Sequence, residues 1–273
     1  MTSAAASAPA FNRLLLTGAA GGLGRELRRR LKAHCAVLRL SDIADLGAAG
    51  PGEELMPAAL EKADAVLALL GGVDAVVHLG GISVEGPFEP IVQANIVGTY
   101  NLYEAARRHG VKRVVFASSN HVIGFYPQSE TIDDRVPHRP DGYYGLSKSF
   151  GENMAQFYFD RYGIETVSIR IGSSFPEPTN RRMMSTWLSY GDLAALVEKS
   201  LFTPDVKHTV VYGMSANRDV WWDNRGAARL GFASQDSSEL FRAKVEAQPP
   251  VAPTDPNSVY QGGAFTAMGP FGD

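Results

Sequence analysis

Residues 17–24 of this chain read Thr-Gly-Ala-Ala-Gly-Gly-Leu-Gly and directly follow a short apolar run at residues 13–16. Gly18, Gly21 and Gly24 are spaced GxxGxxG. In such a loop the first glycine permits a tight turn, the second lets the backbone approach a pyrophosphate, and the third packs the next helix on the strand. The apolar periodicity of residues 22–33 predicts that helix, whose N-terminus favours negative charge. The stretch therefore predicts a strand, a phosphate-binding turn and a helix in that order.

Strand-like and helix-like segments continue to alternate beyond this loop. Further strands are predicted at residues 37–40, 74–79, 113–117, 166–171 and 209–212, with a weakly marked one near 54–56. Further helices are predicted at residues 58–70, 89–109, 144–162 and 191–202. Nearly continuous apolar strands separated by helices are typical of a parallel sheet that is covered on both faces. We therefore expect an α/β fold with a doubly wound parallel sheet of the Rossmann type.

The character of the sequence changes after residue 171. Residues 176–184 form an irregular polar segment, and residues 249–273 are rich in proline and glycine, which predicts mostly loop. We expect residues 12–171 to form the nucleotide-binding domain, and residues 172–273 to form a small C-terminal substrate-binding lobe packed with it as one unit. The lobe would cover the strand ends, where doubly wound sheets bind ligands. Residues 1–11, rich in alanine and serine, are expected to be a disordered leader.

Composition excludes several classes of function. The chain has 273 residues, of which 20% are charged and 45% hydrophobic, and its net charge of −3 gives no basic surface for nucleic acid. No apolar stretch approaches the ~20 residues of a membrane-spanning helix. Cys35 is the only cysteine, so an intrachain disulfide is excluded and a cytoplasmic location is expected. No cluster of histidine, cysteine and acidic residues indicates a metal site.

Asp42 is expected to select the cofactor. It follows the predicted second strand, where a carboxylate accepts hydrogen bonds from the adenosine ribose of NAD and would repel the 2′-phosphate of NADP. No arginine follows at residues 43–45 to bind such a phosphate. The sequence therefore favours NAD. The alternatives are an aspartate that only caps a turn, and a glycine-rich turn that binds nothing.

Tyr144, Lys148 and Ser119 form a candidate proton-transfer group. Tyr144 and Lys148 are four residues apart in a predicted helix, so one face presents both side chains. A free tyrosine has a pKa of ~10, and a nearby ammonium together with a nicotinamide charge can lower it by the roughly three units needed. Ser119 can hydrogen-bond to the reacting hydroxyl, and Asn95 can anchor a water behind the lysine. An exposed tyrosine and lysine would explain the spacing alone, but not its occurrence after the glycine loop, Asp42 and Ser119.

These residues, in this order, resemble the extended branch of the short-chain dehydrogenase/reductase superfamily, which also includes nucleotide-sugar epimerases and dehydratases. Longer strings at residues 78–83, 118–121, 182–187, 221–224 and 261–265 are similar to those of the bacterial uronate dehydrogenases. The resemblance covers nearly the whole chain after the leader. It implies oxidation of the anomeric carbon of hexuronic acids such as galacturonate and glucuronate, with NAD as hydride acceptor and an aldarolactone as product.

The resemblance also implies a role for each matching position. Tyr144 would be the base, assisted by Lys148, Ser119 and Asn95. The implied cofactor-binding residues are Gly18, Gly21, Gly22, Leu23, Gly24, Asp42, Ile43, Leu60, Leu79, Gly80, Gly81, Ile82, Lys148 and Ile171. The implied substrate-binding residues are Ser83, Ser119, Asn120, His121, Tyr144, Ser173, Arg182 and Phe265. In one departure, Ala59 stands where the family has an aspartate near the adenine, which removes that side-chain contact.

Arg181 and Arg182 give a separate argument for an acidic substrate. They lie in the irregular segment that should face the ligand crevice, and a guanidinium can bind a carboxylate through two parallel hydrogen bonds. Arginine pairs are more often exposed, and the resemblance favours the carboxylate role for Arg182 but not for Arg181. His121, without the resemblance, would be interpreted as structural, and His78 and His109 are expected to be structural or exposed.

Three functions are thus compared: a uronate:NAD oxidoreductase, a nucleotide-sugar epimerase or dehydratase, and a non-catalytic NAD-sensing protein. The short C-terminal lobe argues against the second, because a nucleotide diphosphate needs a larger pocket. The intact Tyr144, Lys148, Ser119 and Asn95 argue against the third. The expected partner is a small-molecule sugar acid, with no nucleic acid and no membrane. A homo-oligomer formed through the long helices is expected from the family.

Overall fold

A computed structural model describes residues 10–269 and 271 of the chain. Its centre is one sheet of seven parallel strands in the order β3-β2-β1-β4-β5-β6-β7. The strands are β1 (Phe11–Thr17), β2 (Cys35–Ser41), β3 (Glu53–Leu55), β4 (Ala75–His78), β5 (Arg113–Ser119), β6 (Glu165–Ile171) and β7 (His208–Gly213). The predicted doubly wound parallel sheet is confirmed. The strand order reverses between β1 and β4, the place where such sheets bind ligands.

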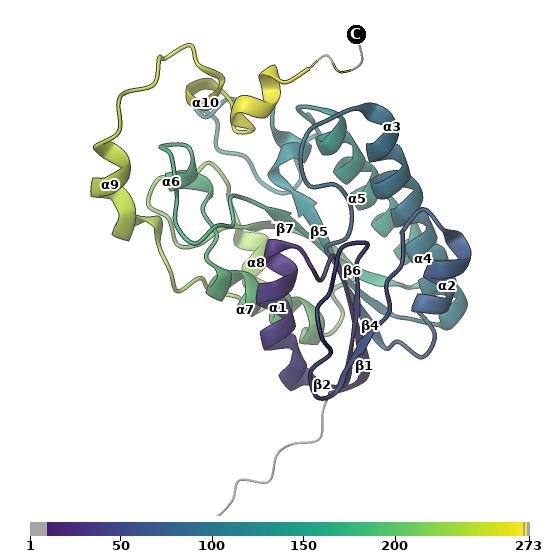
Figure 1. Cartoon of the computed structure of the whole chain (residues 1–273). Helices are drawn as coiled ribbons and strands as arrows, with labels where there is room; N and C mark the ends of the chain where they lie inside the picture. Colours follow the sequence, from purple (N-terminus) through teal and green to yellow (C-terminus); the bar gives the residue numbers. More distant parts are fainter. Residues whose placement is uncertain (1–9, 270, 272–273) are drawn as a thin grey trace, which may run out of the picture.

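Helices cover both faces of this sheet (Figure 1). They are α1 (Gly22–Leu31), α2 (Ala63–Leu69), α3 (Phe88–Ile91), α4 (Gly98–His109), α5 (Tyr143–Tyr162), α6 (Met183–Thr186), α7 (Tyr190–Phe202), α8 (Arg225–Ala228), α9 (Arg242–Glu246) and α10 (Pro256–Val259). Because strand side chains alternate between faces, Leu14 and Leu16 join the core under α1 and α7, whereas Leu15 joins the core under α2, α4 and α5. The sheet is therefore buried on both sides, as apolar parallel strands require.

Two predicted helices differ from those observed. The helix predicted at residues 58–70 begins only at Ala63, because the preceding segment crosses the strand ends and buries Leu60 against Gly98 of α4. The single helix predicted at residues 89–109 consists of α3, a π-helical segment Val92–Val97 and α4. Such a π-helical segment re-aims side chains within a helix, and here it carries Asn95.

The two ends of the chain also refine the expectations. Residues 1–9 of the predicted leader lie outside the described residues, and β1 already begins at Phe11. The mostly irregular segment at residues 249–273 contains α10 and a short 3₁₀ helix, Gly263–Ala267. This segment is tied to the loop after β5, because Gln261 N donates to Tyr126 O at 2.8 Å and Gly262 N to Gly124 O at 2.8 Å. None of the described helices is both long and apolar enough to cross a membrane.

Candidate active site

The glycine loop packs directly against the carboxyl end of β4. Gly18 has φ +69°, and a Cβ there would lie 2.7 Å from the carbonyl carbon of Leu79. A Cβ at Gly24 would collide with the carbonyl oxygen of Gly18, so helix α1 can approach the loop only without a side chain. A Cβ at Gly22, at the start of α1, would have no other atom within 4 Å. The loop is thus closed toward the protein and open in front of the helix N-terminus.

Asp42 joins the end of β2 to this loop. Its Oδ2 accepts from Ala20 N at 3.0 Å, and its Oδ1 accepts from Ala44 N at 3.0 Å. The turn-capping alternative is therefore part of its role, and the carboxylate still has acceptor sites to offer a ligand. Ile43, which the family resemblance implies to be a cofactor-binding residue, is 82% exposed and turns away from the core.

The segment after β4 brings together several residues predicted to line the cofactor. A Cβ at Gly80 would lie 2.8 Å from Leu60 Cδ1, and one at Gly81 would lie 2.5 Å from Asn95 Oδ1. Asn95 is buried; its Oδ1 accepts from Ile82 N at 2.7 Å, and its Nδ2 donates to Ile82 O and to Ser147 Oγ, both at 2.9 Å. The amide thus fixes the loop after β4 to α5.

Tyr144 and Lys148 of α5 and Ser119 at the end of β5 come together as predicted. All three are buried, and Ser119, whose Oγ accepts from His121 N at 3.2 Å, lies close enough to Tyr144 to affect its pKa. Lys148 Nζ lies 5.7 Å from the centroid of the Tyr144 ring and 5.1 Å from that of Phe116. Gly145, which follows Tyr144, is needed for this packing, because a Cβ at Gly145 would collide with the carbonyl oxygen of His121. The glycine lets the turn after β5 approach α5.

Burial dominates the protonation of this group. Desolvation raises the pKa of Tyr144 to about 12, with the Ser119 hydrogen bond acting in the opposite direction and the Asp141 charge adding to the rise. Desolvation also lowers the pKa of Lys148 to about 8. The chain alone therefore gives the opposite of the lowered tyrosine pKa that we expected. That expectation also relied on the positive charge of a bound nicotinamide.

Arg182 lies among polar groups from three segments. Its Nε donates to Gln261 O at 2.7 Å, and its Nη2 donates at 2.7 Å to Asn120 Oδ1 when the amide takes the orientation that satisfies its neighbours. In that orientation Asn120 Nδ2 donates to Ile171 O at 3.1 Å. Burial lowers the pKa of Arg182 to about 10, while the nearby Asp141 carboxylate raises it.

His121 and Phe265 close the site over Tyr144. Their rings stack with centroids 3.9 Å apart and planes 15° apart, and the Tyr144 ring meets both edge-on. Ser173 is buried beside Thr186, at 2.9 Å between hydroxyl oxygens, whereas Ser83 is exposed on the loop after β4. Of the substrate-binding residues implied by the resemblance, His121, Tyr144 and Phe265 are thus in mutual contact, and Asn120 contacts Arg182.

Gln261 connects this site to the rest of the C-terminal segment. It is fully buried, its Oε1 accepts from Trp222 Nε1 at 2.8 Å, and its Nε2 donates to Pro127 O at 3.1 Å and Glu130 O at 2.9 Å. Its carbonyl oxygen holds Arg182, as described above. One glutamine therefore anchors the segment that carries Phe265.

Three other polar residues from the sequence analysis have structural partners, among them His109, whose Nε2 lies 2.8 Å from Leu67 O. Arg181 is exposed, and its Nη2 donates to the carbonyl oxygens of Glu246 at 3.0 Å and Gln248 at 2.9 Å. His78 is buried with Nδ1 2.6 Å from Thr17 Oγ1, and burial lowers its pKa to about 3. His109 is exposed. These positions match the structural or exposed roles we expected for them.

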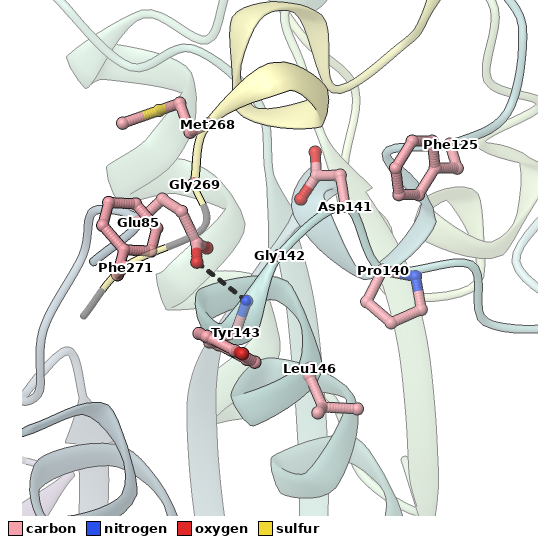
Figure 2. Close-up of a pocket in the computed structure, with 10 residues that line it drawn as sticks. All are labelled: Glu85, Phe125, Pro140, Asp141, Gly142, Tyr143, Leu146, Met268, Gly269 and Phe271. Atoms are coloured by element: carbon pink, nitrogen blue, oxygen red, sulfur yellow. Dashed lines mark hydrogen bonds between the residues drawn. The ribbon is translucent and has the colours of Figure 1, made fainter. Parts of the chain in front are cut away.

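Sequence reasoning missed two buried carboxylates at the start of α5. Glu85 Oε1 accepts from Tyr143 N (Figure 2), and its Oε2 accepts from Tyr144 N, both at 2.9 Å, so a carboxylate from a distant loop caps α5. Asp141 Oδ2 lies 2.6 Å from His121 Nδ1. Gly142, the N-cap residue, has no side chain to satisfy the first helical N–H groups. That glycine was the available signal that an acceptor must come from elsewhere.

Two cavities border the site without including Tyr144. One, of about 330 Å³, is shown in Figure 2 and is lined by Glu85, Phe125, Pro140, Asp141, Gly142, Tyr143, Leu146, Met268, Gly269 and Phe271. The other, of about 260 Å³, is lined by Asn180, Arg181, Arg182, Pro250, Val251, Asn257 and Ser258. The second opens beside the predicted carboxylate clamp.

Residues 14–204 match the model of the NAD dependent epimerase/dehydratase family. The chain belongs to this family. Within the family it is 67% identical to a uronate dehydrogenase of Pseudomonas syringae pv. tomato, over 100% of both chains, and 64% identical to one of Pseudomonas putida, over 96% of this chain and 98% of the relative. These relatives confirm the resemblance to the uronate dehydrogenases.

Solved structures of the family agree. The crystal structure of uronate dehydrogenase from Agrobacterium tumefaciens is 52% identical, with a TM-score of 0.94 over 97% of this chain and 100% of that one. A mutant of that enzyme complexed with NAD has a TM-score of 0.93 at 52% identity, over 95% and 98% of the two chains. The family's fold therefore extends through the C-terminal segment of this chain.

Proposed function

We propose that the protein oxidises hexuronic acids such as galacturonate and glucuronate at the anomeric carbon, with NAD as hydride acceptor and an aldarolactone as product. The observation that carries this is the gathering, in one closed site, of the Tyr144–Lys148–Ser119 group and the guanidinium of Arg182. Relatives that are 67% and 64% identical over nearly the whole chain are uronate dehydrogenases. An anionic sugar is the substrate class that such a site fits.

The residues present fit NAD. A loop whose Gly18 and Gly24 leave no room for a Cβ, and which is open at Gly22, suits close approach of a pyrophosphate to the N-terminus of α1. Asp42 would accept from the ribose hydroxyls, and Lys148 would donate to the nicotinamide ribose. NAD, when bound, would supply the hydride acceptor and a positive charge near Tyr144.

The residues of the chain would each have a separate role in proton transfer or substrate binding. Tyr144 removes the proton of the anomeric hydroxyl, and Ser119 hydrogen-bonds to the same oxygen. Lys148 stabilises the phenolate of Tyr144 when its ammonium is charged. Arg182 binds the C6 carboxylate, and Asn120 orients that guanidinium. As the anomeric C–H and O–H bonds break, the carbon becomes the carbonyl of a ring ester, so the product leaves as a lactone.

A cytoplasmic location and a homo-oligomer are also proposed. Two long helices, α4 and α5, expose large apolar side chains, with Tyr100 50% and Phe157 47% exposed. A contact through these helices would remove that apolar surface from water. Light scattering coupled to size exclusion tests this, and a monomer mass at micromolar concentration would contradict it.

The function is tested by mixing purified protein with NAD and galacturonate, glucuronate or galactose, and by following the absorbance of NADH. We expect NADH from both uronates and little from galactose, since galactose lacks the carboxylate for Arg182. NAD binding without turnover would instead favour a sensing role. A nucleotide-sugar substrate converted without net NADH would favour an epimerase, because an epimerase returns its hydride.

A further inference from the structure

We propose that Asp141 is a positioning residue for sugar recognition, whose carboxylate keeps the imidazole proton of His121 on Nδ1 and leaves Nε2 as a hydrogen-bond acceptor for a sugar hydroxyl. The sugar ligand rests on the function proposed above. The tautomer does not, because it follows from contacts within the chain.

The two residues are joined at two points. Asp141 Oδ2 lies 2.6 Å from His121 Nδ1, and Asp141 N donates to His121 O at 3.3 Å. The Asp141 side chain is 0% exposed and the His121 side chain 12%. An ionised carboxylate has only acceptors, so the shared hydrogen belongs to Nδ1. A neutral imidazole then carries a lone pair on Nε2, on the side of the ring away from Asp141.

The space for this carboxylate is kept by glycines from three segments. A Cβ at Gly124, after β5, or at Gly262, in the C-terminal segment, would collide with Asp141 Oδ2. A Cβ at Gly145 of α5 would lie 3.1 Å from Asp141 Oδ1. Oδ1 is buried and has no hydrogen-bond partner within residues 10–269 and 271. A buried, half-satisfied carboxylate costs stability, and such exceptions occur chiefly at functional sites.

Burial, and not the surrounding charges, favours the neutral form of the His121 imidazole. Burial is the largest effect and lowers its pKa. Arg182 lowers the pKa further, while Asp141 and Glu85 raise it, and Tyr144 and Phe265 contribute only rings. Protonation would turn Nε2 into a donor and remove the acceptor. The site would then lose the hydrogen bond from a sugar hydroxyl while keeping the same shape.

Nitrogen-15 NMR of the imidazole groups in the whole protein tests this directly. Asp141→Asn keeps the side-chain shape but offers either an acceptor or a donor to Nδ1. His121→Gln assigns the His121 signals, and Asp192→Asn is the matched control. Asp192 is also buried, and its carboxylate accepts from Ser215 Oγ at 2.6 Å and from the backbone nitrogens of Gln235 and Asp236, none of which belongs to the candidate site. We expect the Nδ1–H tautomer in the natural protein and in Asp192→Asn, and a shift toward Nε2–H in Asp141→Asn.

Kinetics give the second readout. In Asp141→Asn the KM for the uronate should rise roughly tenfold, the worth of one hydrogen bond, with a smaller change in kcat and unchanged NAD affinity. An Nε2–H tautomer in the natural protein, or an unchanged tautomer and KM in Asp141→Asn, overturns the inference. If Asp141→Asn fails to fold, the tautomer of the natural protein decides alone. Absent uronate oxidation refutes the proposed function, while the NMR result still decides the tautomer.

Discussion

Neutralising Glu85 should loosen the catalytic helix. Its two oxygens accept from the backbone nitrogens of Tyr143 and Tyr144, both at 2.9 Å, at the start of a 20-residue helix whose N-cap is a glycine. In Glu85→Gln only one oxygen is left, and the new amide faces an N–H donor. Losing one charge-assisted hydrogen bond and the favourable interaction with the helix dipole costs about 2 kcal/mol.

For a chain of this length, that cost lowers Tm by roughly 3–4 °C, because unfolding entropy is about 2.1 cal/mol/K per residue. The assay is urea and thermal unfolding, with kcat measured on the same samples. We expect kcat to fall as well, since Glu85 ties the loop that carries Ser83 to the residue beside the base. Glu89→Gln is the control, because the Glu89 carboxylate accepts from the exposed side chain of Gln93. Equal stability of the two variants would refute the capping argument.

Four further outcomes are expected. Tyr144→Phe should lower kcat by roughly 10²–10⁴, and full activity would exclude Tyr144 as the base. Arg182→Ala should raise the KM for uronates about 10–150-fold, and an unchanged preference for uronates over galactose would disprove the clamp. Asp42→Ala should reduce the preference for NAD over NADP, which the ratio of kcat/KM values measures; an unchanged ratio would point to another residue. Lys148 has a pKa of about 8 when folded and 10.5 when unfolded, so the unfolded state holds more protons between these values and stability rises with pH there. Urea midpoints of the natural protein and of Lys148→Met should therefore converge as pH rises from about 8 to 10.5, and parallel curves would contradict the burial of a charged lysine.

The sequence predicts those parts of the site in which the residues are close together in the chain. The glycine loop and the Tyr144–Lys148 pair each lie within one turn or helix, so a period of 3.6 or a run of glycines specifies them. Ser119 follows because parallel strands end at one edge of the sheet. The start of α2 and the π-helical segment at Asn95 could not be predicted this way, since tertiary contacts of Leu60 and Ile82 decide them.

The two carboxylates at α5 show the same limit more sharply. Glu85 and Tyr143 are 58 residues apart in the chain, and Asp141 and His121 are 20 apart. Neither contact follows from the periodicity of a helix or a strand. Each contact forms because β4, β5 and α5 meet at one end of the sheet. The effect of burial on the pKa of Tyr144 could not be predicted from the sequence for a related reason. Burial, which dominates this pKa, is a property of the packed site and not of the motif.

Gln261 ties the guanidinium of Arg182, the proposed carboxylate clamp, to the C-terminal segment. The sheet and the glycine loop supply the chemistry common to a large family, but the guanidinium of Arg182 is aimed by a carbonyl oxygen near the last residues. Gln261, which supplies that carbonyl oxygen, also hydrogen-bonds through its side chain to Trp222 and to the carbonyl oxygens of Pro127 and Glu130 in the loop after β5. On the function proposed above, ligand choice can diverge between relatives by changes in the segment around Gln261, while the strands of the nucleotide-binding sheet stay the same.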